Sequence, residues 1–481
     1  MSGNAGISQG RLALTGLLDA DAVAAAEALL ADLQGSDLET VRVLFPDQHG
    51  VLRGKTLVAS ALASVFTAGV SVPSTLFLKD TSHRTVYPVW DGAGDSPVQG
   101  AGDVLLVPDP STFRHLPHAP GSAWILCDAV MKSGAALPFA PRTVLRRAVQ
   151  ALTGAGLQIQ VGLEVEFHVF EITDPALNHA DATMPPTPPD TRNLAPGYQF
   201  LTETLYARLE PVSEMLRRAL QAIGLPLRSM EVEMGPSQLE FTFDPADPMT
   251  HADNLVMLRT LVKEVCAQEG LHATFMSRPK VANGCASGWH LHQSLFDTMG
   301  TPLMMPQLDG TLSAPAAGWI AGLLDHAAES CLLTTPTVNG YKRYQPYKLA
   351  PDRVVWGHDN RGAMLRAIMA PGDRASRIEN RVPESAANPY YAFASQILSG
   401  LDGLTHGRRP PPPVENPHDA GAEALPRSLG AAIDAFETSA FYRTALGSEV
   451  VDYLVRIKRA EWERYLAHVS DWEQAEYFGL Y

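Results

Sequence analysis

The sequence predicts an α+β fold built from more than one domain. Short segments in which apolar and polar residues alternate are interleaved with longer segments of helical periodicity, such as 209–223 and 254–268. Residues 68–125 differ from the rest, because their abundance of Pro, Gly, Val and Asp with short apolar runs is typical of a small β-rich domain with loops. The 481 residues are enough for several domains with substantial cores. We expect a domain boundary near residue 130.

Three segments on either side of that boundary have clear local signals. Residues 18–34 have a helical composition with an acidic bias at the N-terminal end. Residues 40–57 have the pattern of two short strands around a turn at 47–50. Residues 141–156 predict a helix, in which Pro141 suits the first position because that position needs no backbone N–H donor.

Composition and charge exclude several function classes. The formal net charge of −15 argues against a general binder of nucleic acid or of anionic membranes, since both reward clustered Lys and Arg. The four cysteines are scattered without a CxxC pair, so the sequence suggests neither a disulfide framework nor a zinc ribbon. We find neither a signal-peptide pattern nor an apolar stretch long enough to span a bilayer, so we expect a cytoplasmic protein.

Four predicted strands carry ionisable side chains along one face. In GLEVEFHVF, residues 162–170, the period of two places Glu164 and Glu166 on the same face, opposite the apolar residues. Two neighbouring carboxylates repel, and burying an uncompensated carboxylate is costly, so a positive partner is expected. The pattern recurs in three further strands, through Glu231, Glu233, Gln238 and Glu240, through His290, His292 and Ser294, and through Arg377, Glu379 and Arg381.

The identity of these side chains indicates a site. For any single strand a solvated polar face is the better interpretation, but the four together collect Glu, His and Arg with almost no Lys. Carboxylate oxygens with one or two imidazoles suit Mg²⁺ or Mn²⁺ better than zinc. Arginines among carboxylates suit recognition of phosphate or carboxylate groups. The combination is typical of phosphoryl transfer, and segment 339–366 adds further basic residues at Lys342, Arg343, Arg361 and Arg366.

These segments resemble the glutamine synthetase family. The matching blocks are GLEVEF, EMGPSQLEF, SGWHLHQSL, NGYKRYQP, DNRGAMLR and SRIENRVPESAANPY, which occur in the family's order. The resemblance implies an N-terminal helical segment (1–36), a β-grasp domain (37–130) and a catalytic α+β domain (131–481). It also implies a homo-oligomer, usually a dodecamer of two stacked hexameric rings, with each active site between neighbouring subunits.

The resemblance further implies ATP, glutamate and two or more divalent metals as ligands. One metal site matches Glu166, Glu233 and Glu240, and the other matches Glu164, His290 and Glu379. Glutamate would be held by Arg343 and Arg381 together with Glu166. ATP would be bound by His292, Ser294, Arg361, Arg366 and Arg377, and we predict Arg361 and Arg343 as catalytic residues. In this chemistry the glutamate γ-carboxylate attacks the ATP γ-phosphate, and an amine then attacks γ-glutamyl phosphate.

The sequence departs from the family where the family handles ammonium. The family's flap carries a catalytic Glu in YKR…PGYEAP, whereas this chain has YKRYQPYKLAP with Leu349 at that position. The family's FDGSS segment, with its ammonium-binding Asp, is replaced by SVPSTLFLKD at 71–80. Ammonium must be captured and deprotonated by carboxylates, whereas an arylamine is already neutral at pH 7. We therefore expect an organic-amine ligase, similar to γ-glutamylamide synthetases of amine catabolism, with Leu349 and Tyr198 in an amine pocket that favours aromatic or otherwise apolar amines.

Two alternatives stay open from the sequence alone. One is an ammonia-using glutamine synthetase in which another residue replaces the lost Glu, and the other is a catalytically inactive regulatory relative. The second is disfavoured because all six positions that match metal ligands are intact. NGCASGWH in place of the family's NGSGMH also leaves open whether glutamate is the only acid substrate. We predict no adenylylation of the loop at 405–429, because it contains no tyrosine.

Overall fold

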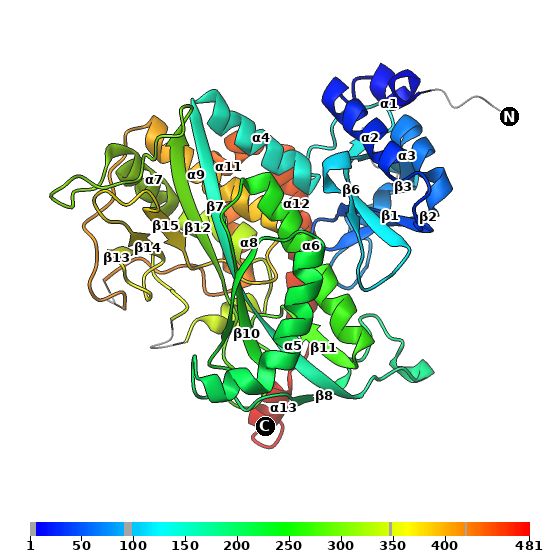
Figure 1. The fold of residues 1–481 in the computed structure, drawn as a ribbon. Helices are drawn as coiled ribbons and strands as arrows, with labels where there is room; N and C mark the ends of the chain where they lie inside the picture. Colours follow the sequence, from blue (N-terminus) through cyan, green and yellow to red (C-terminus); the bar gives the residue numbers. More distant parts are fainter. Residues whose placement is uncertain (1–5, 91–98, 346–348, 419–420) are drawn as a thin grey trace.

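Two separate β-sheets organise the chain (Figure 1). The computed structural model describes residues 6–90, 99–345, 349–418 and 421–481. Within these ranges the strands up to Met131 form one sheet and the strands after it form the other, with helices packed around both. The predicted α+β class is confirmed, whereas the exact limits of the three predicted domains stay a prediction.

The first sheet has six strands in the order β2–β1–β6–β4–β3, with β5 paired to β6. The turn expected at 47–50 is present, and the Asp47 carboxylate accepts hydrogen bonds from the backbone N–H groups of His49 and Val51 at 2.8 and 3.0 Å. The strands are β1 (Thr40–Pro46), β2 (Leu52–Val58), β3 (Val70–Pro73), β4 (Asp103–Pro108), β5 (Arg114–His115) and β6 (Ser122–Met131). The helices that accompany them are α1 (Arg11–Leu14), α2 (Ala20–Asp32) and α3 (Leu62–Ala68).

The second sheet has nine strands in the order β13–β14–β15–β12–β7–β10–β9, with β11 and β8 also paired to β7. All four segments predicted to carry ionisable ladders contribute to this sheet, and segment 230–243 supplies two of its strands, β9 and β10. The strands are β7 (Leu157–Asp174), β8 (Asp190–Asn193), β9 (Leu227–Val232), β10 (Gln238–Phe243), β11 (Leu271–Thr274), β12 (Trp289–Asp297), β13 (Trp356–His358), β14 (Leu365–Ile368) and β15 (Arg377–Asn380).

Helices cover the apolar face of the second sheet, which leaves its polar face available for a site. On β7 Leu163, Val165 and Phe167 are fully buried in the core, whereas from Val165 to Phe170 both faces of the strand are covered. Trp289 of β12 packs edge-to-face on Phe393 of α9 at 5.3 Å between ring centroids. The helices of this part are α4 (Pro141–Gly154), α5 (Glu203–Ala222), α6 (Pro248–Gln268), α7 (Ala314–Asp325), α8 (Ala327–Thr334), α9 (Pro389–Thr405), α10 (Leu429–Thr438), α11 (Ala440–Ala445), α12 (Ser448–Leu466) and α13 (Asp471–Tyr477).

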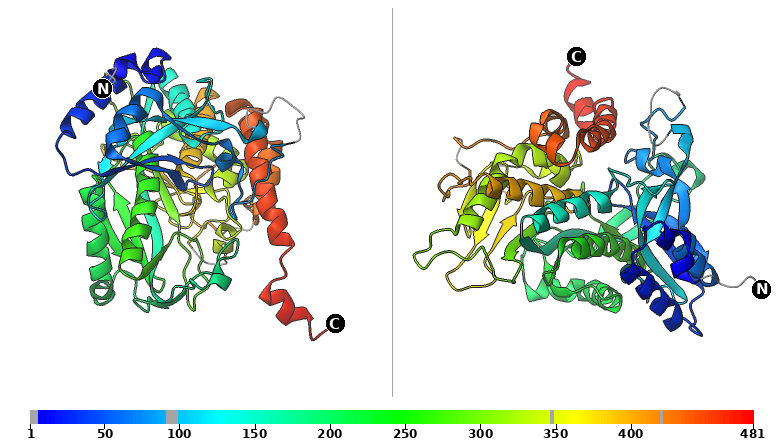
Figure 2. Two further views of the ribbon diagram at one scale, coloured as in Figure 1. Left: turned by 90° about the vertical axis from the view of Figure 1, so that its right-hand side faces the viewer. Right: turned by 90° about the horizontal axis from the view of Figure 1, so that it is seen from above.

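The predicted helices are present but two of them begin earlier than expected. Helix α6 starts at Pro248 because the Asp247 carboxylate accepts a hydrogen bond from the Thr250 N–H and caps the first turn. This start precedes the apolar periodicity that marked 254–268. The last helix, α13, projects from the body of the chain near the C-terminus, as Figure 2 shows in red, and none of its residues is buried. Among the described residues, no helix is both long and apolar enough to cross a membrane.

Candidate active site

A cavity of about 1680 Å³ lies on the polar face of the second sheet. Its lining comes from β7, β9, β10 and β12, and from the segments around Arg343, Arg361 and Arg377. Every residue predicted for the site lines this cavity except Glu379 and Tyr198. Glu379 is fully buried beneath the lining, next to Arg366 and Arg381. The ladders seen in sequence thus converge on one place.

Strand register explains this convergence. Glu164 of β7 lies opposite His290 of β12, and one step along β7 Glu166 lies opposite Glu240 of β10. On the other side of β12, His292 lies opposite Glu379 of β15. Because residues two apart share a face, these pairs form one continuous row of ionisable side chains across the sheet.

Three carboxylates, which we call the carboxylate cluster, gather at one end of this row. Glu166, Glu233 and Glu240 each place an oxygen within 4.8 Å of the others. Burial, and to a smaller extent the charge of Glu233, raises the pKa of Glu166 to about 8. Burial, and to a smaller extent the charges of Glu166 and Glu164, raises the pKa of Glu240 to about 10. The protein's own cations therefore compensate these charges incompletely, which is the condition that a divalent cation would relieve.

A further carboxylate supports this fit. Glu231 lies opposite Glu240 on β9, and its Oε2 atom is buried without a hydrogen-bond partner among the described residues. Burial raises the pKa of Glu231 as well. The site thus has more carboxylate oxygens than the protein's own hydrogen-bond donors can satisfy. Such oxygens are the ligands that Mg²⁺ and Mn²⁺ prefer, so the residues fit the predicted metal.

The second predicted metal set is present in altered form. Glu164 accepts from His290 Nδ1 at 3.2 Å and from His292 Nε2 at 2.8 Å, and His290 Nδ1 lies 4.0 Å from Glu379 Oε1. Two groups have the proximity of metal ligands, namely Glu164 with Glu240 and His290, and Glu164 with His292 and Glu379. His292, predicted for the nucleotide, thus sits among candidate ligands. The set of Glu164, His290 and Glu379 stays a prediction.

Arginines surround Glu379 at the other end of the row, and we call this region the arginine half. Arg366 Nη1 donates to Glu379 Oε2 at 3.0 Å, and Arg381 Nη1 donates to Glu379 Oε1. Arg377 Nε bonds His292 Nδ1 at 3.1 Å. Arg361, which is exposed, lines the cavity, and its charge acts on nearby Asp359. Cations therefore outnumber carboxylates here, which suits an anionic ligand.

The remaining predicted residues lie at separate places around the cavity. Ser294 Oγ donates to the Ser376 carbonyl at 3.2 Å. Leu349 lines the cavity and is 56% exposed. Tyr198 is 82% exposed and lies outside the lining, so its assignment to the amine pocket stays a prediction.

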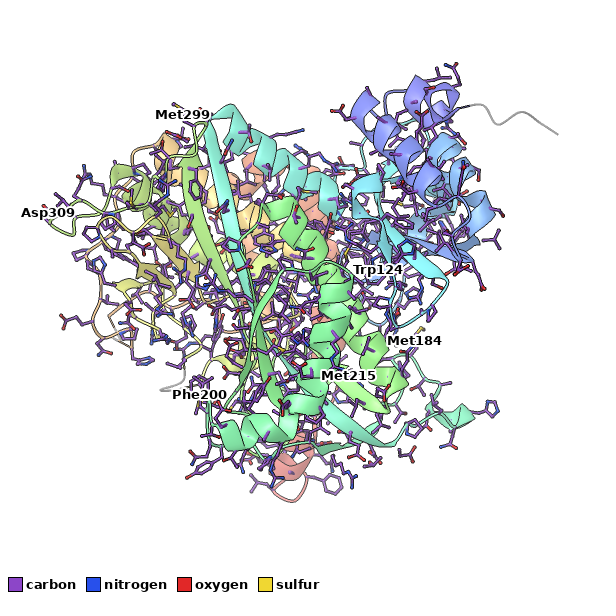
Figure 3. The ribbon with its side chains drawn as sticks, viewed as in Figure 1. Trp124, Met184, Phe200, Met215, Met299 and Asp309 are labelled. Atoms are coloured by element: carbon purple, nitrogen blue, oxygen red, sulfur yellow. The ribbon has the colours of Figure 1, made fainter. Side chains whose placement is uncertain are left out.

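Apolar residues that the sequence analysis missed line the cavity near the carboxylate cluster. They are Phe200, labelled in Figure 3, with Leu201 and Met234. Their place is fixed by the backbone, because the Tyr198 N–H donates to the Met234 carbonyl at 2.9 Å and the Leu201 N–H donates to the Val232 carbonyl at 3.3 Å. No periodicity marks residues 197–201, so no sequence signal could have placed them.

Three further residues that sequence reasoning left unassigned hold Glu166. The Gly288 N–H donates to Glu166 Oε2 at 2.9 Å, and Gln238 Nε2 donates to the same oxygen at 3.2 Å. Gln238 also donates to Ser287 Oγ at 3.0 Å. Gln238 lies on a ladder already identified in sequence, so its position was visible even though its role was not.

The chain resembles known proteins over nearly its whole length. A family model described as "Glutamine synthetase, catalytic domain" matches residues 138–477. The γ-glutamylanilide synthase of an Acinetobacter species is 38% identical over 95% of this chain and 96% of its own. The γ-glutamylethanolamide synthetase GlnA4 of Streptomyces coelicolor is 34% identical over 93% of this chain and 94% of its own.

A solved structure agrees with these sequence matches. GmaS without ligand superimposes with a TM-score of 0.78 at 26% identity, covering 94% of this chain and 99% of that one. The glutamate–isopropylamine ligase of a Pseudomonas species is a further relative, 29% identical over 93% of this chain and 96% of its own. The ladders, the carboxylate cluster and these matches agree, and the chain belongs to the glutamine synthetase family.

Proposed function

We propose that this protein is an ATP-dependent ligase that joins the γ-carboxylate of glutamate to an organic amine, with an aromatic or otherwise apolar amine favoured. The observation that carries the proposal is the wall of the cavity near the carboxylate cluster. There Leu349 stands at the position of the family's catalytic Glu, and Phe200, Leu201 and Met234 add apolar surface. An apolar wall favours an organic amine over a small hydrated cation.

The names of related proteins support the same reaction. The relatives include a γ-glutamylanilide synthase, a γ-glutamylethanolamide synthetase and a glutamate–isopropylamine ligase. All three names describe glutamate joined to an organic amine. Ammonia-using glutamine synthetases are also among the relatives, such as that of Methanosarcina mazei at 32% identity. An ammonia-using enzyme is therefore the competing proposal, and Leu349 counts against it.

The arginine half suits the nucleotide. Arg361, Arg366 and Arg377 would bind the phosphates of ATP and stabilise the charge that spreads over the transferred phosphoryl group. Arg366 is itself oriented by Asp359, whose Oδ1 accepts from its Nε and Nη2 at 2.9 and 2.6 Å. A guanidinium fixed in this way loses less conformational entropy when phosphate binds.

The carboxylates suit divalent cations. Glu166, Glu233 and Glu240 would hold one Mg²⁺ or Mn²⁺, and Glu164 with His290, His292 and Glu379 would hold a second. When bound, such cations neutralise the phosphate charge and polarise the acceptor oxygen. Arg343 and Arg381 would hold glutamate beside them, so that its γ-carboxylate oxygen faces the γ-phosphate.

The amine would enter from the apolar wall. Its nitrogen lone pair attacks the carbonyl carbon of γ-glutamyl phosphate, the C–O bond to phosphate breaks, and the proton that the nitrogen loses leaves with the phosphate. An arylamine is uncharged at pH 7 and needs no base before attack, which fits a site that has Leu349 in place of a carboxylate. Residues Phe200 and Met234 would contact the organic group.

We include assembly in the proposal as a homo-oligomer, a dodecamer of two hexameric rings with active sites between subunits. Family membership supports it. Light scattering on the purified protein would measure it, and a monomeric mass under assay conditions would contradict it.

The test is ATP- and glutamate-dependent phosphate release with Mg²⁺, run in parallel against ammonium, alkylamines, polyamines and anilines. Aspartate in place of glutamate controls for the acid, and omission of amine gives the blank. A large response to one organic amine with ammonium near the blank supports the proposal. A dominant ammonium response would identify a glutamine synthetase with a rebuilt amine site.

A further inference from the structure

Glu384 is a buried carboxylate that lies beside the cavity but outside its lining. It is 0% exposed, and it accepts hydrogen bonds from Ser277 Oγ at 2.5 Å, from the Thr337 N–H at 2.8 Å and from Thr337 Oγ1 at 2.8 Å. Within the described ranges no Lys, Arg or His nitrogen forms an ion pair with it, although the charges of Arg343 and Arg259 are near enough to interact with it. Neutral donors from two separate segments therefore satisfy this carboxylate, and it fastens those segments to the end of β15.

One chain of hydrogen bonds leads from Glu384 to Arg343. Thr337 Oγ1 donates to Glu384 and accepts from the Gly340 N–H at 3.0 Å. The Gly340 carbonyl in turn accepts from Arg343 Nε at 3.2 Å. A side chain at Gly340 would collide with this arrangement, because a Cβ there would lie 2.5 Å from Glu384 Oε2. The turn that carries Arg343 is thus packed directly onto the carboxylate.

Three backbone carbonyls and one side-chain hydroxyl use almost all the donors of the Arg343 guanidinium. Besides Gly340, it donates to Thr335 Oγ1 at 3.2 Å, to the Val382 carbonyl, and from Nη1 to the Pro383 carbonyl at 3.1 Å. One N–H on Nη1 has no acceptor among the described residues. That nitrogen faces Gly288, where an added Cβ would lie 3.5 Å from it. Arg343 therefore keeps one donor, with a fixed direction, at the cavity.

A second chain leads from the same carboxylate to Glu166. The Ser277 carbonyl accepts from the Ser287 N–H at 2.7 Å. The next residue, Gly288, donates its N–H to Glu166 Oε2 at 2.9 Å. Gln238 closes the connection by donating to both Ser287 Oγ and Glu166 Oε2, at 3.0 and 3.2 Å. The segment that carries Gly288 is thus held between the buried carboxylate and the carboxylate cluster.

We propose that Glu384 is a positioning residue that sets the placement of Arg343 relative to Glu166, and thereby aligns the acid substrate with the metal-binding carboxylates. The inference rests on the proposed function, because that function assigns glutamate to Arg343. Neither chain of hydrogen bonds passes through Arg366 or Arg377, so nucleotide binding is expected to be independent of Glu384.

Three variants separate the two chains. Glu384→Gln keeps the side-chain volume but replaces one acceptor oxygen by a donor. In place of Oε2 this donor would oppose the hydroxyls of Ser277 and Thr337, and in place of Oε1 it would oppose the Thr337 N–H. We expect it to raise the KM for glutamate about tenfold or more, with the KM for ATP changed by less than about twofold. Thr337→Val breaks only the chain to Arg343 and should reproduce the glutamate effect. Ser277→Ala breaks only the chain to Glu166 and should raise the Mg²⁺ concentration needed for half-maximal activity.

A matched control removes charge from another buried carboxylate. Glu461 is 8% exposed and pairs with Lys458 at 3.0 Å on α12. Glu461→Gln should leave the KM for glutamate unchanged. Glu384→Asp, which keeps the charge with a shorter reach, should recover part of the glutamate affinity that Glu384→Gln loses. Equal changes in the KM for glutamate and the KM for ATP in Glu384→Gln would overturn the proposal, and so would a KM for glutamate that matches the wild-type value.

Hydrogen–deuterium exchange tests the positioning role without relying on turnover. In Glu384→Gln, peptides covering 277–288 and 337–343 should exchange faster, while peptides from β7 should exchange as in the wild type. Unchanged exchange in both segments would overturn the inference whatever the enzyme's substrate. Absence of glutamate-dependent phosphate release in the wild-type protein would instead overturn the proposed function.

Discussion

The carboxylate cluster and the arginine half both contain buried glutamates, but the surroundings shift the pKa of these glutamates in opposite directions. In the cluster, burial and neighbouring carboxylates raise the pKa of Glu166 to about 8 and of Glu240 to about 10. At the other end burial also opposes ionisation, but Arg381 and the two histidines outweigh it and lower the pKa of Glu379. The pKa of Glu164 is also lowered, because the hydrogen bonds from His290 and His292 outweigh the effect of its burial.

The difference shows which half depends on an external cation. Glu379 has its positive partners within the chain, so the arginine half keeps its form without a ligand. Among the described residues, the carboxylate cluster has His290, at 3.8 Å from Glu166 and 3.6 Å from Glu240, and the charges of Arg381 and Arg343 act on Glu166. These partners leave the pKa values of Glu166 and Glu240 raised, so protons or a bound cation must balance the rest of the charge. We therefore expect metal binding at the carboxylate cluster and nucleotide binding in the arginine half to be separable by substitution.

The largest expected effect comes from removing a carboxylate of the cluster. Glu166→Ala should lower turnover by more than about 100-fold, because it removes a proposed metal ligand and not merely an outer partner. Steady-state phosphate release measures it. Glu171→Ala is the matched control, since Glu171 lies on the same strand outside the cavity and pairs with exposed Arg192. Retained activity in Glu166→Ala would overturn the metal assignment.

A smaller effect is expected in the arginine half. Arg377→Ala should raise the KM for ATP about tenfold, the range for a hydrogen bond to a charged group, and leave the KM for glutamate within about twofold. Arg377→Lys keeps the charge but loses the planar fork, so it should fall between the alanine variant and the wild type. A selective loss of glutamate affinity would contradict the proposed division of the cavity.

The apolar wall should control the choice of amine. Leu349→Glu is expected to shift the ratio of kcat/KM values toward ammonium by about tenfold, because it restores a carboxylate that can capture and deprotonate a cation. Leu349→Gln has similar size without charge and should produce no such shift. An unchanged preference in the Glu variant would show that this side chain does not line the amine pocket.

The size of the organic group gives a weaker test of the same wall. Met234→Ala should raise the KM for an arylamine about threefold to tenfold, with less effect on a small alkylamine. Met184→Ala is the matched control, since Met184 is 56% exposed against 49% for Met234 and lies outside the cavity lining. Equal KM changes for both amines would argue against contact with the organic group.

The smallest expected effect concerns stability. Without metal, Glu240→Gln should unfold about 2 °C or more above the wild type, because the neutral amide removes the repulsion that raises the pKa of Glu240. Added Mg²⁺ should raise the unfolding temperature of the wild type more than that of the variant. Thermal unfolding with and without Mg²⁺ measures both shifts, and a larger Mg²⁺ shift in the variant would contradict this interpretation of the cluster.

Sequence periodicity located the ladders well because strand alternation is local. Strands β7, β10, β12 and β15 each contain at least two of their functional residues at i and i+2, and the structure brings them to one cavity. Strands β8, β13 and β14 contain at most one predicted site residue each, Arg366 of β14, so no pair at i and i+2 marked them, unlike the equally short β15. Their places depend on long-range pairing with β7 and β15.

The irregular segments show where sequence reasoning ended. Tyr198 and Leu201 both have positive φ, 85° and 57°, so side chains in this segment do not follow the alternation of a strand. Phe200 and Leu201 line the cavity while Tyr198 does not. Which neighbour faces the cavity depends on backbone angles that composition does not reveal. The same holds for Glu384, whose place beside Ser277 and Thr337 is set by contacts over 107 and 47 residues.

The most direct measurement follows an oxygen atom. Glutamate labelled with ¹⁸O in its γ-carboxylate is incubated with ATP, Mg²⁺, the protein and an equimolar mixture of aniline and ammonium, and both products are analysed by mass spectrometry. We predict one ¹⁸O in each phosphate released and γ-glutamylanilide as the main product, because the carboxylate oxygen attacks phosphorus and leaves with it. Unlabelled phosphate, or glutamine as the main product, would contradict the proposed reaction.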